Sequence, residues 1–274
     1  MPKIKANGIN IYYEQQGSGE PLILIPYLTA DNQCYAFQVP EYAKHFTVYT
    51  LDLRGTGQSD DPGGEISIEQ YADDVAAFMD ALEIPQAHIS GLSLGAAVGM
   101  WLAAKYPDKV KSLSLLSGWA KSDPYLTAVV QGWQASAKGL DNVAEMAIVS
   151  IFPYCLTCEL YATKPEYIQG LGDFVRSRPK MSVEYFMKQS NAVIAHDVEA
   201  ELGKITAPTL IAFGERDQLT SLRFANALKN GIRNSELLVF DGCSHGMIYE
   251  KVEEFNAKTL EFLQLQSHTK SASV

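Results

Sequence analysis

The stretch Ala87-His88-Ile89-Ser90-Gly91-Leu92-Ser93-Leu94-Gly95-Ala96 decides the fold of this chain. It contains the pattern Gly-x-Ser-x-Gly over residues 91–95, with a short apolar run before it and a helical pattern after it. A serine on a sharp strand-to-helix turn needs small neighbours, because the helix crosses close to the strand; Gly91 and Gly95 leave that room. The five-residue pattern alone is common, but between a strand and a helix it predicts that Ser93 is a nucleophile.

Length and composition restrict the class of protein. The 274 residues are enough for one large domain or two small ones, and 47% of them are hydrophobic, which allows a substantial core. The net charge of −10 argues against nonspecific binding to nucleic acid or anionic membranes. The N-terminus has no secretory pattern and no apolar run is long enough for a membrane span, so we expect a cytoplasmic protein.

The four cysteines give no reason to expect a metal. Cys155-x-x-Cys158 has the spacing of half a zinc or redox motif, but no second Cys/His pair lies at a suitable distance. We therefore expect reduced thiols and no metal.

Apolar runs alternate with helical patterns along most of the chain. The expected helices are 67–82, with Ser67 as its cap, 94–106 and 252–265. The expected strands are 9–14, 21–25, 47–51, 87–90, 110–116, 209–213 and 236–240. This alternation predicts an α/β fold with a mainly parallel sheet and helices on both faces. The polar tail from Ser267 is expected to be disordered.

The pattern changes between about residues 121 and 203, where helical stretches are broken by prolines and aromatic residues are frequent. We expect a helical cap over the carboxyl edge of the sheet, where open α/β sheets bind ligands. The alternative is that these are further core helices. The cap would divide the chain into a first core part (1–120), the cap (121–203) and a second core part (204–274). The expected substrate contacts in and beside the cap are Trp119, Trp133 and Phe152.

A serine hydroxyl needs a neighbouring base, and the base needs an acid that orients it. His245 follows the expected strand 236–240, and Asp217 follows 209–213, so both lie at the carboxyl edge of the sheet. The order Ser93, Asp217, His245 is the one that this kind of serine elbow requires. The alternatives considered for the base and the acid are His45, His88, His196, His268, Glu215 and Asp241.

Acyl transfer also needs N–H donors for the developing oxyanion. The residue after the nucleophile, Leu94, is expected to give one backbone N–H, and Leu28, in the loop after strand 21–25, the other. Pro26 has no N–H and cannot serve.

These residues resemble the α/β-hydrolase superfamily over nearly the whole chain. The matching landmarks are Asp52-Leu53-Arg54-Gly55-Thr56-Gly57-Gln58-Ser59, the elbow at 91–95, Gly214-Glu215-Arg216-Asp217 and Ser244-His245-Gly246. Within the superfamily the chain is most similar to esterases and lactonases of the 3-oxoadipate enol-lactonase type. The resemblance implies an eight-stranded sheet, a helical cap and a serine hydrolase without a cofactor.

The chain differs from most members of the superfamily at Pro26-Tyr27, where those relatives carry His-Gly. Tyr27 lies at the mouth of the expected site and either contacts the substrate or only packs. Arg176 and Arg178 in the cap either hold a substrate carboxylate or, as we expect, are surface charges.

We therefore predict hydrolysis of a carboxylic ester, lactone or thioester of a small or medium substrate. The alternatives are carbon–carbon bond hydrolysis or perhydrolysis on the same triad, or a ligand-sensing signalling protein of the same fold. The sequence does not give the oligomeric state.

Overall fold

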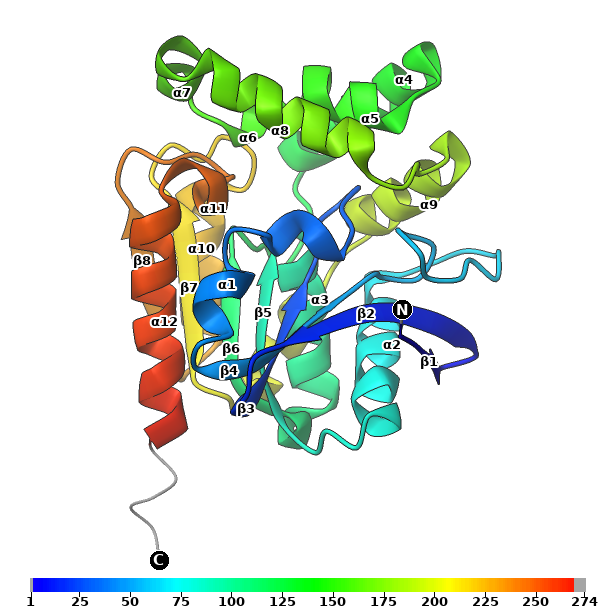
Figure 1. Ribbon diagram of the computed structural model, residues 1–274. Coiled ribbons are helices and arrows are strands. Elements are labelled where there is room, and N and C mark those ends of the chain that lie inside the picture. Colours follow the sequence, from blue (N-terminus) through cyan, green and yellow to red (C-terminus); the bar gives the residue numbers. More distant parts are fainter. Residues whose placement is uncertain (1, 269–274) are drawn as a thin grey trace, which may run out of the picture.

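The computed structural model describes residues 2–268 and is built around one eight-stranded sheet (Figure 1). The strand order is β1-β2-β4-β3-β5-β6-β7-β8, with antiparallel pairing at β1, β2 and β4 and parallel pairing from β4 to β8. The strands are β1 (Lys3–Ala6), β2 (Ile9–Gln16), β3 (Glu20–Ile25), β4 (Phe46–Leu51), β5 (Ala87–Leu92), β6 (Val110–Leu116), β7 (Thr209–Gly214) and β8 (Ser235–Phe240). The predicted α/β class and the mainly parallel sheet are confirmed.

Helices cover both faces of the sheet because its strands are apolar on both sides. In β3, Ile23 and Ile25 belong to one core cluster while Leu22 and Leu24 belong to another on the opposite face. The helices outside the inserted region are α1 (Val39–Tyr42), α2 (Ile68–Ala81), α3 (Leu94–Lys105), α10 (Ser221–Gly231), α11 (Met247–Glu250) and α12 (Val252–His268). Residues of α2, α3 and α10 pack in the first cluster, and residues of α1, α11 and α12 pack in the second.

Helix α2 begins as the sequence predicts. The Ser67 side chain accepts a hydrogen bond from the Gln70 N–H, which satisfies one of the free donors of the first turn. Tyr71, Val75 and Phe78, at helical spacing, are fully buried.

The region between β6 and β7 is helical. It contains α4 (Pro124–Leu140), α5 (Val143–Met146), α6 (Phe152–Cys155), α7 (Cys158–Thr163), α8 (Pro165–Ser177) and α9 (Val183–Ile194). In Figure 1 the green helices α4 to α8 form a layer beyond one end of the sheet. A helical insertion is therefore present, while its proposed limits at residues 121 and 203 stay a prediction.

Besides the four-residue helices α1 and α11, which are not among the expected helices, three features differ from the expectations. β1 is not among the expected strands, because it has only four residues, too few for its alternation of Lys3, Ile4, Lys5 and Ala6 to stand out. α10 was also missed, since it buries only Phe224, Ala225 and Leu228. Helix α12 continues to His268, so the prediction that disorder begins at Ser267 is wrong. Residues 269–274 of that tail lie outside the described part of the chain.

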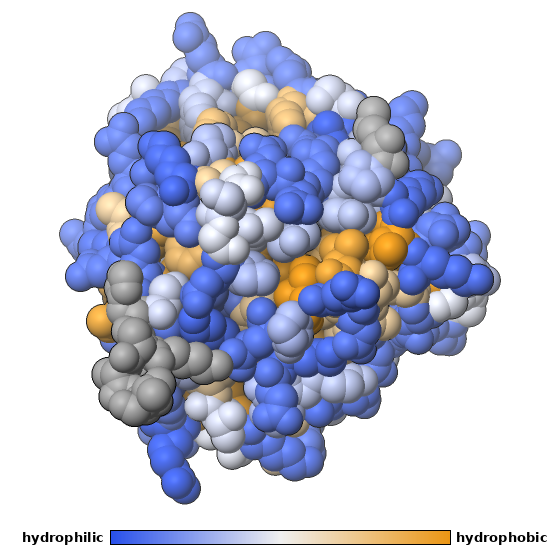
Figure 2. Space-filling model, turned by 60° about the horizontal axis from the view of Figure 1, so that its bottom comes forward, coloured by the Kyte–Doolittle hydropathy of each residue, from blue (hydrophilic) through white to orange (hydrophobic). Residues whose placement is uncertain are grey.

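The surface turned away from the inserted helices is mostly polar. Hydrophilic residues cover most of the face shown in Figure 2, and hydrophobic residues gather in a smaller area. None of the helices within residues 2–268 combines the length and the apolar composition needed to cross a bilayer.

Candidate active site

Ser93 stands alone on the turn between β5, which ends at Leu92, and α3, which begins at Leu94. Its φ of 56° and ψ of −116° are unusual for a residue with a side chain. A Cβ on Gly91 would lie 2.2 Å from the carbonyl of Gly95, and a Cβ on Gly95 would lie 2.2 Å from the Ile25 oxygen. Both glycines are thus required for the close crossing of strand and helix, as the sequence indicates.

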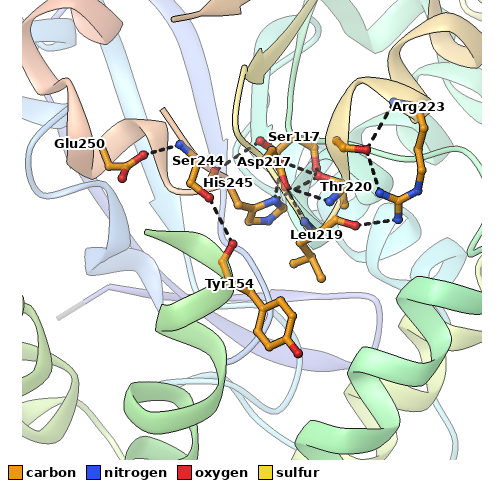
Figure 3. A network of polar contacts seen from close by, with 10 residues as sticks. Ser117, Tyr154, Asp217, Leu219, Thr220, Arg223, Ser244, His245 and Glu250 are labelled. Atoms are coloured by element: carbon orange, nitrogen blue, oxygen red, sulfur yellow. Dashed lines mark hydrogen bonds and ion pairs between the residues drawn. The ribbon is translucent and has the colours of Figure 1, made fainter. Parts of the chain in front are cut away.

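Asp217 and His245 come together at the same end of the sheet (Figure 3). Asp217 follows β7 and His245 follows β8; both are buried, and Asp217 Oδ2 lies 2.9 Å from His245 Nδ1. Asp217 Oδ1 accepts hydrogen bonds from the Leu219 and Thr220 N–H groups at 2.8 and 2.9 Å. Burial alone would raise the pKa of Asp217, but His245 and the Thr220 hydrogen bonds outweigh it and lower that pKa. The carboxylate is therefore ionised and faces the imidazole.

Thr220 is a residue that the sequence reasoning missed. Its hydroxyl lies 2.8 Å from Asp217 Oδ2, 3.1 Å from His245 Nδ1 and 3.0 Å from the Ser117 carbonyl oxygen. The only signal in the sequence is a threonine three residues after the expected acid, a spacing at which side chain and backbone often bond locally. Thr220 fixes the carboxylate from a second side.

The loop that carries His245 is also held by the inserted helices (Figure 3). Glu250 accepts one hydrogen bond from the Ser244 N–H at 2.5 Å and another from the Thr157 N–H at 2.6 Å. The Gly246 N–H donates to the Cys155 carbonyl oxygen at 2.7 Å. The position of the imidazole thus depends on α6 and α7 as well as on the sheet.

Ser93, His245 and Thr220 line one cavity of about 450 Å³. No hydrogen bond joins Ser93 to His245 within residues 2–268, which differs from a closed triad. Such bonds are often long before substrate binds and tighten in the complex, so proton transfer between these two side chains stays a prediction.

Leu28 and Leu94 stay the predicted oxyanion donors: Leu28 lines the cavity with Ser93, and Leu94 directly follows Ser93 as the first residue of α3. Both residues are buried. Neither backbone N–H has a hydrogen-bond acceptor in the described part of the chain. The contact between Gly95 and the Ile25 oxygen brings the start of α3 against the end of β3, from which the Leu28 loop leaves. Both N–H groups are therefore free to serve as the predicted donors.

None of the alternative bases and acids whose side chains the structure describes lines the cavity with Ser93. His88 is fully buried in the sheet between Ser112 and Glu20, and His196 bonds the Trp119 carbonyl oxygen at 3.1 Å. The side chains of His45, Glu215 and Asp241 are exposed, and Glu215 accepts from the Gly242 N–H. The His268 side chain lies outside the described part of the structure.

Tyr27, Trp119, Trp133 and Phe152, the four expected substrate contacts, all line the cavity. The Tyr249 hydroxyl donates to the Cys34 carbonyl oxygen at 2.8 Å and lies 2.7 Å from the Tyr27 hydroxyl. Because Tyr249 has only one hydrogen, Tyr27 must donate to Tyr249. The Tyr27 hydroxyl therefore has only acceptor capacity left for anything else.

The two cap arginines behave differently. Arg176 pairs with Glu145 and Asp173 and is exposed, but it also lines the cavity, so its reading as a surface charge stays a prediction. Arg178 instead bonds the buried carboxylate of Asp31 at 2.8 Å and is less exposed, at 29% of its side chain. The expectation of a surface charge is wrong for Arg178, because a buried carboxylate on the loop after β3 recruits it.

The thiols of Cys155 and Cys158 are free, and the part of the chain from 2 to 268 contains no cluster of three His, Cys, Asp or Glu side chains suited to a metal.

Comparisons with known proteins agree with this geometry. A sequence model of the alpha/beta hydrolase fold matches residues 20–252. The 3-oxoadipate enol-lactonase 2 of Acinetobacter baylyi is 30% identical over 224 residues, which cover 80% of this chain and 79% of the relative. The crystal structure of the enol-lactonase from Burkholderia xenovorans LB400 superposes with a TM-score of 0.85, at 26% identity, over 96% of this chain and 100% of the other. The structure of Est816, described as an N-acyl homoserine lactone degrading enzyme, has a TM-score of 0.80 at 26% identity, over 95% of this chain and 100% of the other.

Proposed function

The chain belongs to the alpha/beta hydrolase fold family, and from that premise we propose that it hydrolyses a carboxylic ester, lactone or thioester through Ser93, His245 and Asp217. One observation carries the proposal: the buried Asp217–His245 pair opens onto the same cavity as a serine held at φ 56°. Strained backbone of this kind persists where the surrounding structure enforces it, often at a site of chemistry.

The proposed reaction begins when Ser93 Oγ attacks the carbonyl carbon and His245 Nε2 takes its proton. Asp217 accepts the hydrogen bond from Nδ1 and so keeps Nε2 free to act as the base. The N–H groups of Leu28 and Leu94 stabilise the negative oxygen of the tetrahedral intermediate. The imidazolium then protonates the leaving alcohol or thiol, and water, activated in the same way, releases the acid from Ser93.

The cavity supports a small or medium, largely apolar substrate. Its walls are mostly aliphatic and aromatic side chains, among them Trp133, Phe152 and Leu219. A volume of about 450 Å³ lies within the range of sites for small ligands. Relatives named for enol-lactones and N-acyl homoserine lactones favour lactones as the first compounds to test.

The test compares Ser93→Ala with wild type on p-nitrophenyl butyrate and a panel of lactones. We expect turnover to fall by at least about 1000-fold, since the residual rate comes only from binding and the oxyanion donors. Ser112→Ala is the matched control: Ser112 also bonds a histidine, but it is fully buried in β6 and should leave turnover unchanged. Undiminished hydrolysis by Ser93→Ala would contradict the proposal.

A further inference from the structure

The loop after β3 contains a turn that its own sequence disfavours. The Ala30 N–H donates to the Tyr27 carbonyl oxygen at 3.1 Å, and Thr29 has a φ of 70° while Leu28 keeps a negative φ. This combination matches a type II turn, whose third position requires a positive φ and usually holds glycine or asparagine. Threonine is branched at Cβ and resists that conformation. The turn therefore needs support from outside the loop.

Gln189 provides a hydrogen bond to this turn. The Thr29 N–H donates to Gln189 Oε1 at 3.1 Å, although the two residues are 160 positions apart. Gln189 lies on α9 of the inserted region, and its side chain is fully buried. A buried amide is costly unless its oxygen and its nitrogen are both bonded, so its other contacts decide how firmly it is held.

A directed chain of hydroxyl groups fixes the orientation of that amide. Tyr185 gives its one hydrogen to the Arg54 carbonyl oxygen. Tyr71, 3.0 Å from Tyr185, must therefore donate to Tyr185, and its oxygen accepts the Gln189 Nε2–H at 3.4 Å. With the nitrogen used in this way, the Gln189 oxygen faces Thr29.

The orientation of this amide selects the turn type. In a type I turn Thr29 would have a comfortable negative φ, but the Leu28–Thr29 peptide would be rotated and the Thr29 N–H would point away from Gln189. The Leu28 N–H, the expected oxyanion donor, belongs to the preceding peptide, so Gln189 acts on it by fixing ψ of Leu28 and by bonding the loop to α9. We infer that Gln189 is a positioning residue of the oxyanion hole, which holds the Leu28 loop in its strained form; the inference rests on the proposed function.

The first test replaces Gln189 with leucine, which has a similar size and no acceptor. Losing an oxyanion donor outright lowers kcat by a factor of about 100 to 1000, so misplacing one should lower kcat by about 10-fold. The KM for p-nitrophenyl butyrate should change little. Phenylboronic acid, which forms a tetrahedral adduct on a serine, should lose affinity by the same factor as kcat. Ser190→Ala is the control, because Ser190 is buried on the same helix but bonds Gln134 and Met187 instead of the loop.

The second test relieves the turn itself. Glycine adopts a positive φ without cost, so Gln189→Leu should lower kcat less than about 3-fold when it is made in a Thr29→Gly background. If Gln189→Leu does not fold, Tyr71→Phe, which removes the acceptor of Gln189 Nε2 together with the Tyr71–Tyr185 hydrogen bond, should lower kcat with unchanged KM.

Two results would overturn the inference: an equal loss of kcat in both backgrounds, or a fall in melting temperature with kcat and boronate affinity unchanged. Failure of the proposed function is recognised separately, because Ser93→Ala would then retain turnover.

Discussion

Replacing Asp217 with asparagine tests the proposed triad most sharply, because the structure dictates how the new amide would sit. One oxygen of Asp217 accepts two backbone N–H groups, from Leu219 and Thr220. Turning an amide nitrogen toward them would leave two buried donors unsatisfied, at a cost of about 1–3 kcal/mol each. The NH₂ group must therefore face His245. The imidazole would then have to accept at Nδ1 and carry its hydrogen on Nε2, where it cannot take a proton from Ser93.

We expect Asp217→Asn to lower kcat by about 10⁴-fold, which corresponds to about 5 kcal/mol of barrier. Initial rates on p-nitrophenyl butyrate measure the loss, and a thermal melt establishes that the variant is folded. Asp241→Asn is the matched control, because Asp241 is exposed on the loop before His245 and its replacement should leave kcat within about 2-fold. A folded Asp217→Asn variant within 10-fold of wild type would show that Asp217 does not orient the base.

Two further changes probe the elbow and the effect of pH. Gly95→Ala places a Cβ 2.2 Å from the Ile25 oxygen and should lower both kcat and the melting temperature. Gly132→Ala, whose Cβ would meet open space on α4, should instead raise the free energy of unfolding by up to about 1 kcal/mol. Thermal melts and initial rates compare the two variants. Burial, partly offset by the Trp119 carbonyl, lowers the pKa of His196 from 6.5 to about 4. Between pH 6.5 and 4 the unfolded chain binds a proton at His196 that the folded chain does not bind, so the free energy of unfolding falls by up to about 3 kcal/mol as the pH drops through this interval. Urea unfolding of His196→Gln should therefore show a smaller fall over the same interval. An equal pH dependence in the variant would contradict this assignment.

The sequence predicts those parts of the fold that local patterns specify. Buried parallel strands such as 110–116 are continuous apolar runs, and Ser67 marks the start of α2 with a side chain that caps it. β1 escapes prediction because it has only four residues, and α10 escapes it because only Phe224, Ala225 and Leu228 are buried. Local patterning therefore finds the elements that build the core and misses those at its margin.

The candidate site follows the same division. Ser93, Asp217 and His245 are predictable because each follows a strand, and the ends of parallel strands meet at one edge. Thr220 and Gln189 are not predictable, since their roles come from contacts made after folding. The Arg178–Asp31 pair is missed for the same reason: nothing near either residue in sequence indicates that they meet.

A second serine, histidine and carboxylate set in this chain shows why residue type and contact alone do not define a site. Ser112 Oγ lies 2.7 Å from His88 Nδ1, and Glu20 lies 3.1 Å from His88 Nε2. Ser112 and His88 are fully buried inside the sheet, and neither lines the cavity. Burial lowers the pKa of His88 despite the nearby Glu20, so this imidazole resists the protonation that a base must undergo. At Ser93 the sharp turn after β5 takes the residue out of the sheet and to the wall of the cavity. The backbone of the elbow is therefore what distinguishes Ser93, the proposed nucleophile, from a buried serine with the same kind of neighbours.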